Sequence, residues 1–169
     1  MKQFINISIL PLFILLFSLL SCSTTPDLKP STSKDPDVSQ PLEIREKIRS
    51  AKKILNRGNE LFQKDKIEEA KKASEDSIES YPTADGYYLL GSCEFKLGRH
   101  AKAKEAFEKA IVISPKMEQL LLTFALTLTT LGEEEKAIEV YRNLEAYYPK
   151  EKVYPFKLGV LLKSLKRYA

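Results

Sequence analysis

The feature that most constrains this chain is an internal repeat of 34 residues. Glycine, alanine, proline and aromatic residues recur at that interval. The matched positions are Gly91 with Ala125 and Gly159, Gly98 with Gly132, Ala103 with Ala137, Phe107 with Tyr141, and Pro115 with Pro149. An earlier unit is offset by 33, with Gly58, Ala70, Ser77 and Pro82 preceding Gly91, Ala103, Ala110 and Pro115. A fixed period of this length indicates a solenoid of similar stacked units.

Each unit has the residues of two helices joined by a tight turn. Small residues such as Gly91 and Ala103 let two helices cross closely, and Pro115 ends the second helix. One hairpin cannot bury its apolar face alone, so the units have to stack. We therefore predict an all-α fold with helices at 42–64, 67–80, 84–97, 100–113, 118–131, 134–147 and 153–167.

The unit at 84–117 resembles the tetratricopeptide repeat through Tyr87, Leu90, Gly91, Gly98, Ala103, Phe107, Ala110 and Pro115. Glu94 stands where the family has an aromatic residue, and Phe95 is expected to replace it. The resemblance implies a right-handed solenoid of about three repeats, at 51–83, 84–117 and 118–151, closed by a capping helix at 152–169. The structural positions carried over are Gly58, Gly91, Gly98, Ala103, Phe107, Ala110, Pro115, Gly132, Ala137, Tyr141, Pro149 and Gly159.

The amino terminus has the pattern of a targeting segment. The apolar run from Ile5 to Leu20 would span about 24 Å as a helix, short of the roughly 30 Å core of a bilayer. The run ends in Leu19-Leu20-Ser21-Cys22, and these four residues resemble the lipobox of bacterial lipoproteins. The resemblance implies a signal peptide at 1–21 and a lipid-bearing Cys22, although an uncleaved anchor or a plain secretory signal remains an alternative.

A tether follows the lipobox. Residues 22–41 are rich in Ser, Thr and Pro and contain hardly any apolar side chains, so they cannot offset the entropy of ordering. We therefore place the folded domain at 42–169. Ser23 does not match the Asp that favours retention at the inner membrane, and we expect an outer-membrane location facing the periplasm or the cell surface.

Composition argues against several classes of function. The chain has one histidine, two cysteines and a net charge of +4. We expect no metal site, no cofactor, no nucleic-acid partner and no catalytic residues, because no acid, nucleophile or second ligand is placed near His100 by spacing. Cys93 follows Gly91 on a helix where a small buried residue is expected, and we interpret it as a packed free thiol.

The family binds its partners in a concave groove lined by the first helix of each unit. The groove residues implied here are Leu55, Asn59, Phe62, Tyr88, Ser92, Phe95, Leu122, Leu126 and Phe156, with Thr129, Val160 and Lys163 extending the surface. Chaperone-type members hold a C-terminal carboxylate with Lys, Asn and Arg, and of that set Asn59 alone is present. An apolar groove suits an amphipathic helix or an extended hydrophobic peptide, unless the chain's termini or a second copy cover it.

These observations favour a non-enzymatic, lipid-anchored scaffold of the bacterial envelope that binds an unidentified protein partner. A more specific alternative is an accessory lipoprotein of outer-membrane β-barrel or type IV pilus secretin assembly. An enzyme is a third possibility, because a fold by itself excludes no activity.

Overall fold

The computed structural model describes residues 40–165, and within them the chain forms helices and turns without a strand. The helices are α1 (Leu42–Gln63), α2 (Ile67–Ser80), α3 (Ala84–Lys96), α4 (His100–Ile113), α5 (Glu118–Thr130), α6 (Glu134–Tyr147) and α7 (Val153–Ser164). The predicted helices are confirmed, with ends that agree to within three residues. None of the helices in 40–165 is long and apolar enough to cross a membrane.

The predicted signal peptide at 1–21, Cys22 and most of the tether lie outside the described residues. The described part belongs to one compact unit, Asp37–Ala169.

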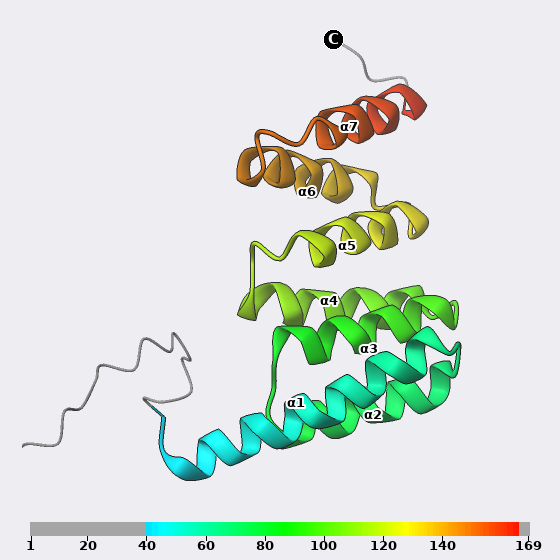
Figure 1. The fold of residues 1–169 in the computed structure, drawn as a ribbon. Coiled ribbons are helices and arrows are strands. Elements are labelled where there is room, and N and C mark those ends of the chain that lie inside the picture. Colours follow the sequence, from blue (N-terminus) through cyan, green and yellow to red (C-terminus); the bar gives the residue numbers. More distant parts are fainter. Residues whose placement is uncertain (1–39, 166–169) are drawn as a thin grey trace, which may run out of the picture. The chain divides into compact units, whose positions relative to one another are not determined.

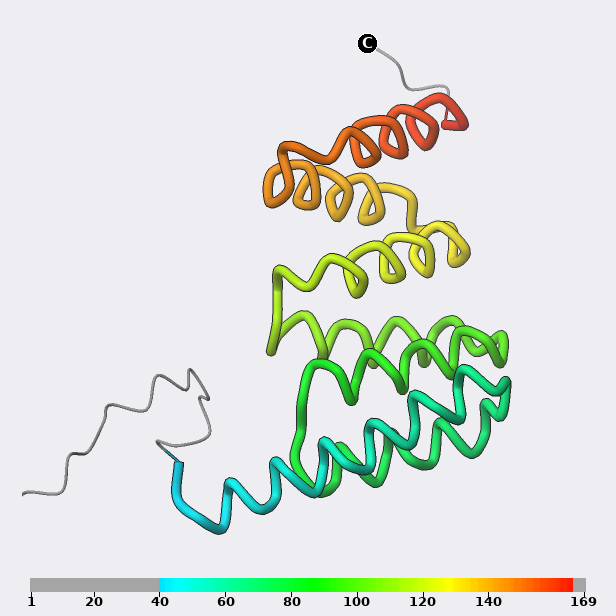
Figure 2. Tube along the Cα trace, viewed as in Figure 1, coloured from blue at the N-terminus to red at the C-terminus, as the bar shows by residue number. Residues whose placement is uncertain are grey.

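Successive helices pair into hairpins that stack along the chain (Figures 1 and 2). The hairpins are α1 with α2, α3 with α4, and α5 with α6, and α7 packs on α6. The first helices of adjacent units also meet, α1 with α3 and α3 with α5. The structure therefore confirms the predicted solenoid of helical hairpins.

The turns inside the hairpins repeat one backbone geometry. Gly98 and Gly132 have φ values of +73° and +74°, and Asp65 takes the same left-handed conformation at φ 58° in the first unit. In each turn an amide after that residue donates back to the helix, as Arg99 does to the Glu94 carbonyl at 2.9 Å. These are Schellman-type helix ends, which favour glycine, and aspartate is among the few other residues that tolerate this region.

The close crossing predicted at Gly91 is present, but its partner is an aromatic ring. A Cβ at Gly91 would lie 2.5 Å from Cε1 of Phe107. Phe107 is fully buried, so its ring has no room to withdraw. The sequence predicts Ala103 at this contact. Ala103 and Ala110 are buried on α4 and let it approach, while Phe107 fills the space over Gly91.

The last helix differs from the expected cap. Gly159 occupies the repeat position of Gly91, yet a Cβ there would meet nothing within 4 Å. Tyr154 and Leu161 are buried on one side of α7, whereas Phe156 and Val160 are exposed. Within the described residues, α7 therefore presents an exposed apolar face where the sequence predicts a capping helix.

The same substitution at these two glycines tests the stacking. Gly91→Ala should reduce the free energy of unfolding by roughly 1–3 kcal/mol, because the added methyl overpacks the site against Phe107. Gly159→Ala should leave it unchanged or increase it by up to about 1 kcal/mol, because alanine has the better helix propensity. Urea unfolding followed by circular dichroism measures both. Equal losses at the two positions would contradict the crossing at Gly91.

Candidate functional site

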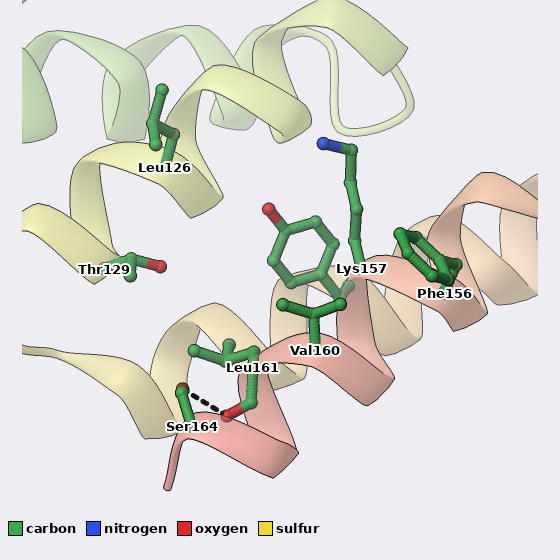
Figure 3. Close-up of a pocket in the computed structure, with 8 residues that line it drawn as sticks. Leu126, Thr129, Phe156, Lys157, Val160, Leu161 and Ser164 are labelled. Carbon is green, nitrogen blue, oxygen red and sulfur yellow. Dashed lines mark hydrogen bonds between the residues drawn. The ribbon is translucent and has the colours of Figure 1, made fainter.

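The clearest candidate site is a pocket of about 350 Å³ between α5 and α7, with one residue from α6 (Figure 3). We call it the α5/α7 pocket. It lies between the first helices of two consecutive units, on the surface that the repeat pattern assigns to the groove. Its lining residues are Leu126, Thr129, Tyr141, Phe156, Lys157, Val160, Leu161 and Ser164.

Large apolar side chains are exposed around this pocket. Phe156 is 71% exposed, Val160 53% and Leu126 50%. On α7, Phe156 and Val160 are four residues apart and so lie on the same face of the helix. The buried residues Tyr154 and Leu161 hold α7 against the core, which leaves the Phe156 face uncovered.

The hydroxyl groups of the pocket are engaged to different extents. Thr129 donates to the Ala125 carbonyl at 2.9 Å, and Ser164 donates to the Leu161 carbonyl at 2.7 Å, the dashed line in Figure 3. Tyr141 is 9% exposed, and its hydroxyl has no hydrogen-bond partner among the described residues. Burial raises the pKa of Tyr141 above its usual value, so its hydroxyl remains a donor at neutral pH.

Lys157 is the one charged residue that lines the α5/α7 pocket. Within residues 40–165 no carboxylate pairs with it, although lysines of earlier units are paired across helices. Lys71 lies 3.2 Å from Glu94, and Lys104 lies 2.6 Å from Glu133. The pocket therefore combines apolar walls with two unused donors, the Tyr141 hydroxyl and the Lys157 ammonium.

The structure brings four of the predicted groove residues together at the pocket, namely Leu126, Thr129, Phe156 and Val160. Tyr88, Phe95 and Leu122 are partly buried and pack against the main core cluster. They therefore offer only part of their side chains to a ligand.

The predicted residues of α1 contribute less. Leu55 is 7% exposed and packs with Ala70, Leu89 and Cys93, so its assignment to the groove surface is wrong. Phe62 is partly buried below the Lys96 ammonium, which lies 5.2 Å from the ring centroid. Asn59 is exposed.

The surroundings of Ser92 and Glu94 also differ from those that the repeat pattern predicts. Ser92 is partly buried, and its hydroxyl donates to the Tyr88 carbonyl at 2.8 Å. Glu94, where an aromatic residue was expected, is 4% exposed and forms ion pairs with Lys71 and Arg99. Phe95, which was expected to replace that aromatic residue, contacts the His100 ring at a tilt of 60°, with ring centroids 4.9 Å apart.

Sequence reasoning missed four lining residues, Tyr141, Lys157, Leu161 and Ser164. Tyr141 is one of the predicted structural positions, one period after Phe107, and that period was the available signal. The structure adds that this aromatic residue borders an open pocket.

The described residues contain no group of three His, Cys, Asp or Glu side chains that could hold a metal ion. Cys93 is fully buried as a free thiol, in agreement with its predicted packing role. Burial raises the pKa of the Cys93 thiol to about 12, and the nearby Glu94 carboxylate adds to the increase.

Residues 84–117 match the family model of the tetratricopeptide repeat. By sequence, no curated protein matches significantly. Among solved structures, the first tetratricopeptide domain of Spaghetti (RPAP3), bound to the HSP90 peptide SRMEEVD, is similar with a TM-score of 0.65 and 18% identity over 70% of this chain and 97% of that one.

Two further structures have the same TM-score of 0.65. MamA is 19% identical over 73% of this chain and 75% of that chain. A tetratricopeptide repeat protein from Parabacteroides merdae is 21% identical over 71% of this chain and 48% of that chain. These likenesses establish the all-α tetratricopeptide fold.

The burial of Cys93 predicts a thiol that does not react in the folded protein. In a full-length Cys22→Ser variant Cys93 is the sole thiol, since the chain has two cysteines. With a pKa of about 12, roughly one thiol in ten thousand is ionised at about pH 8. Ellman's reagent should therefore detect no thiol in the native protein and one per chain in guanidinium chloride. Rapid reaction of the native protein would contradict the packing.

Proposed function

We propose that this chain is a non-enzymatic, lipid-anchored scaffold of the bacterial cell envelope that binds a protein partner through the surface around the α5/α7 pocket. The observation that carries the proposal is the apolar cluster of Phe156, Val160 and Leu126 exposed beside that pocket. An exposed apolar cluster next to a concavity is typical of an interaction site.

Contact with a partner is more favourable for such a surface than contact with water. Burial of apolar area stabilises a complex by about 25 cal/mol per Å², and an aromatic anchor in a desolvated pocket can contribute about 2 kcal/mol or more to the binding free energy. Phe156 has the exposure needed for this role, whereas the partly buried Tyr88 and Phe95 have less area left to give.

The similar RPAP3 domain is bound to a peptide, and this likeness supports the proposal that the present chain also binds a peptide segment. The mode of recognition should differ. Of the Lys, Asn and Arg that hold a terminal carboxylate in chaperone-type members, this chain keeps Asn59, and it has Leu122 and Leu126 at the groove positions of its third repeat. We therefore expect an apolar interface with an internal segment of the partner.

The anchor in this proposal is Cys22, which follows the apolar run and the lipobox-like residues. Several acyl chains at about 0.8 kcal/mol per buried CH₂ would hold the protein on a bilayer. A Ser/Thr/Pro-rich segment between Cys22 and α1 would let the helical unit reach a partner at a distance from the lipid surface.

The groove test removes apolar area beside the pocket. Phe156→Ala with Val160→Ala should weaken capture of the partner by about 30-fold or more, which corresponds to roughly 2 kcal/mol. Helicity should be unchanged because both side chains are exposed. Affinity capture from envelope extracts with the full-length chain, quantified by mass spectrometry, measures the loss.

The matched control lies on α4. Val112 is 85% exposed and Ile113 is also exposed, and neither lines the α5/α7 pocket. Val112→Ala with Ile113→Ala removes apolar area elsewhere and should leave capture intact. Full capture by the Phe156 and Val160 double variant would place the partner surface elsewhere.

The anchor test uses Cys22→Ala. Because its thiol is the proposed acyl acceptor, the variant should carry no acyl label and should accumulate as uncleaved precursor. Metabolic labelling with an acyl-chain analogue measures this, with Cys93→Ala as the control that should keep the label. Label on the Cys22→Ala variant would rule out Cys22 as the anchor.

A further inference from the structure

We infer that the α5/α7 pocket receives an acidic amphipathic helix, whose apolar side chain enters the pocket while a neighbouring carboxylate binds Lys157 and the Tyr141 hydroxyl. The inference rests on the proposed function and names the chemistry of the partner at the same surface. It is carried by the unused polar groups of the pocket and by the charge of α7.

The charge of α7 has one sign. From Lys152 to Leu165 the chain has three lysines, Lys152, Lys157 and Lys163, and no acidic residue. Lys157 and Lys163 have no ion-pair partner among residues 40–165, and Lys157 itself lines the pocket. Carboxylates on a partner would therefore meet cations that no described side chain of this protein neutralises.

The polar groups inside the pocket point to an acceptor. The hydroxyl protons of Thr129 and Ser164 are already donated to backbone carbonyls. Tyr141 is nine-tenths buried and lines the pocket, yet its hydroxyl has no described acceptor. Because Tyr141 lines the pocket, its hydroxyl is open to a ligand there, and a partner's carboxylate oxygen would accept from it and from the Lys157 ammonium.

The apolar residues have the spacing of a helix-binding surface. Val153, Phe156 and Val160 follow one another at intervals of three and four along α7, and all three are exposed. Leu126 and Thr129 of α5 line the pocket together with Phe156 and Val160 of this stripe (Figure 3). A groove between two helices of this kind fits an amphipathic helix with anchors at i, i+3 or i+4, and i+7.

A second copy of this chain docked through the same face is disfavoured by charge. A symmetric contact would bring Lys157 and Lys163 of both copies into one interface. Like charges at close range disfavour such an interface unless acidic residues separate them. An acidic helix of another protein meets no such repulsion.

Two labelled probe peptides test the inference. Both are amidated helices of about 18 residues, roughly 27 Å long, with the same stripe of Leu and Phe. One carries Glu and the other Lys at every flanking position. Fluorescence anisotropy with the full-length chain in detergent, against a detergent blank, gives the two affinities.

We expect the Glu probe to bind about tenfold more tightly than the Lys probe, with a smaller ratio at an ionic strength of about 0.5 M. Lys157→Glu should abolish the preference, whereas Lys53→Glu, at an exposed position on α1, should keep it. Tyr141→Phe should weaken the Glu probe about fivefold without lowering the thermal midpoint, because no described hydrogen bond is lost.

Equal binding of both probes, binding of neither, or a preference that survives Lys157→Glu would overturn the inference. A different result would contradict the proposed function itself. If Lys157→Glu has no effect but the Phe156 and Val160 double variant loses its captured partner, the groove stands and the acidic helix is wrong. If that double variant keeps its partner, the groove itself is wrong.

Discussion

The structure depends on helices that cross closely enough for a ring to lie directly over a glycine. At Gly91 the space that a side chain would fill is taken by the buried ring of Phe107. That contact fixes how α3 meets α4, and the next hairpin stacks on the resulting surface. The neighbouring units have their own small residues at this position, Gly58 and Ala125, and the turns at Asp65, Gly98 and Gly132 repeat one geometry, so the hairpins stack in a similar way.

The same repetition accounts for the candidate site. In the earlier units a side chain packs against the glycine, Leu89 at Gly58 and Phe107 at Gly91, but among the described residues nothing lies within 4 Å of a Cβ at Gly159. Helix α7 buries Tyr154 and Leu161 against its neighbours and leaves Phe156 and Val160 exposed. The α5/α7 pocket thus arises where the regular stacking meets a helix with an uncovered apolar face.

The sequence predicted the helices well because their signals are local. Prolines and glycines mark helix ends and the apolar stripe marks a helix face, and both signals can be found within one short stretch of sequence. The predicted helix ends therefore agree with the structure to within three residues. The Asp65 turn shows the limit of this reasoning. The 33-residue offset aligned it with Gly98, yet the left-handed conformation became evident only from the backbone.

Burial was harder to predict than secondary structure. The groove pattern assigned Leu55 to the surface, but contacts with Ala70 and Leu89 from two other helices bury it. Glu94 is buried because Lys71 of α2 compensates its charge, and the 23-residue separation of these two residues gave no signal of that pairing. Local patterns specify a helix face, whereas the depth of a side chain depends on distant segments.

Hydrogen exchange gives the most direct test that α5 and α7 form the partner surface. Exchange of backbone amides would be compared with and without the bound partner, over α1 (Leu42–Gln63), α5 (Glu118–Thr130) and α7 (Val153–Ser164). The account predicts slower amide exchange in α5 and α7 on binding and no change in α1, because the partner would contact the helices around the α5/α7 pocket and not α1. Protection concentrated in α1, with α7 unchanged, would contradict it.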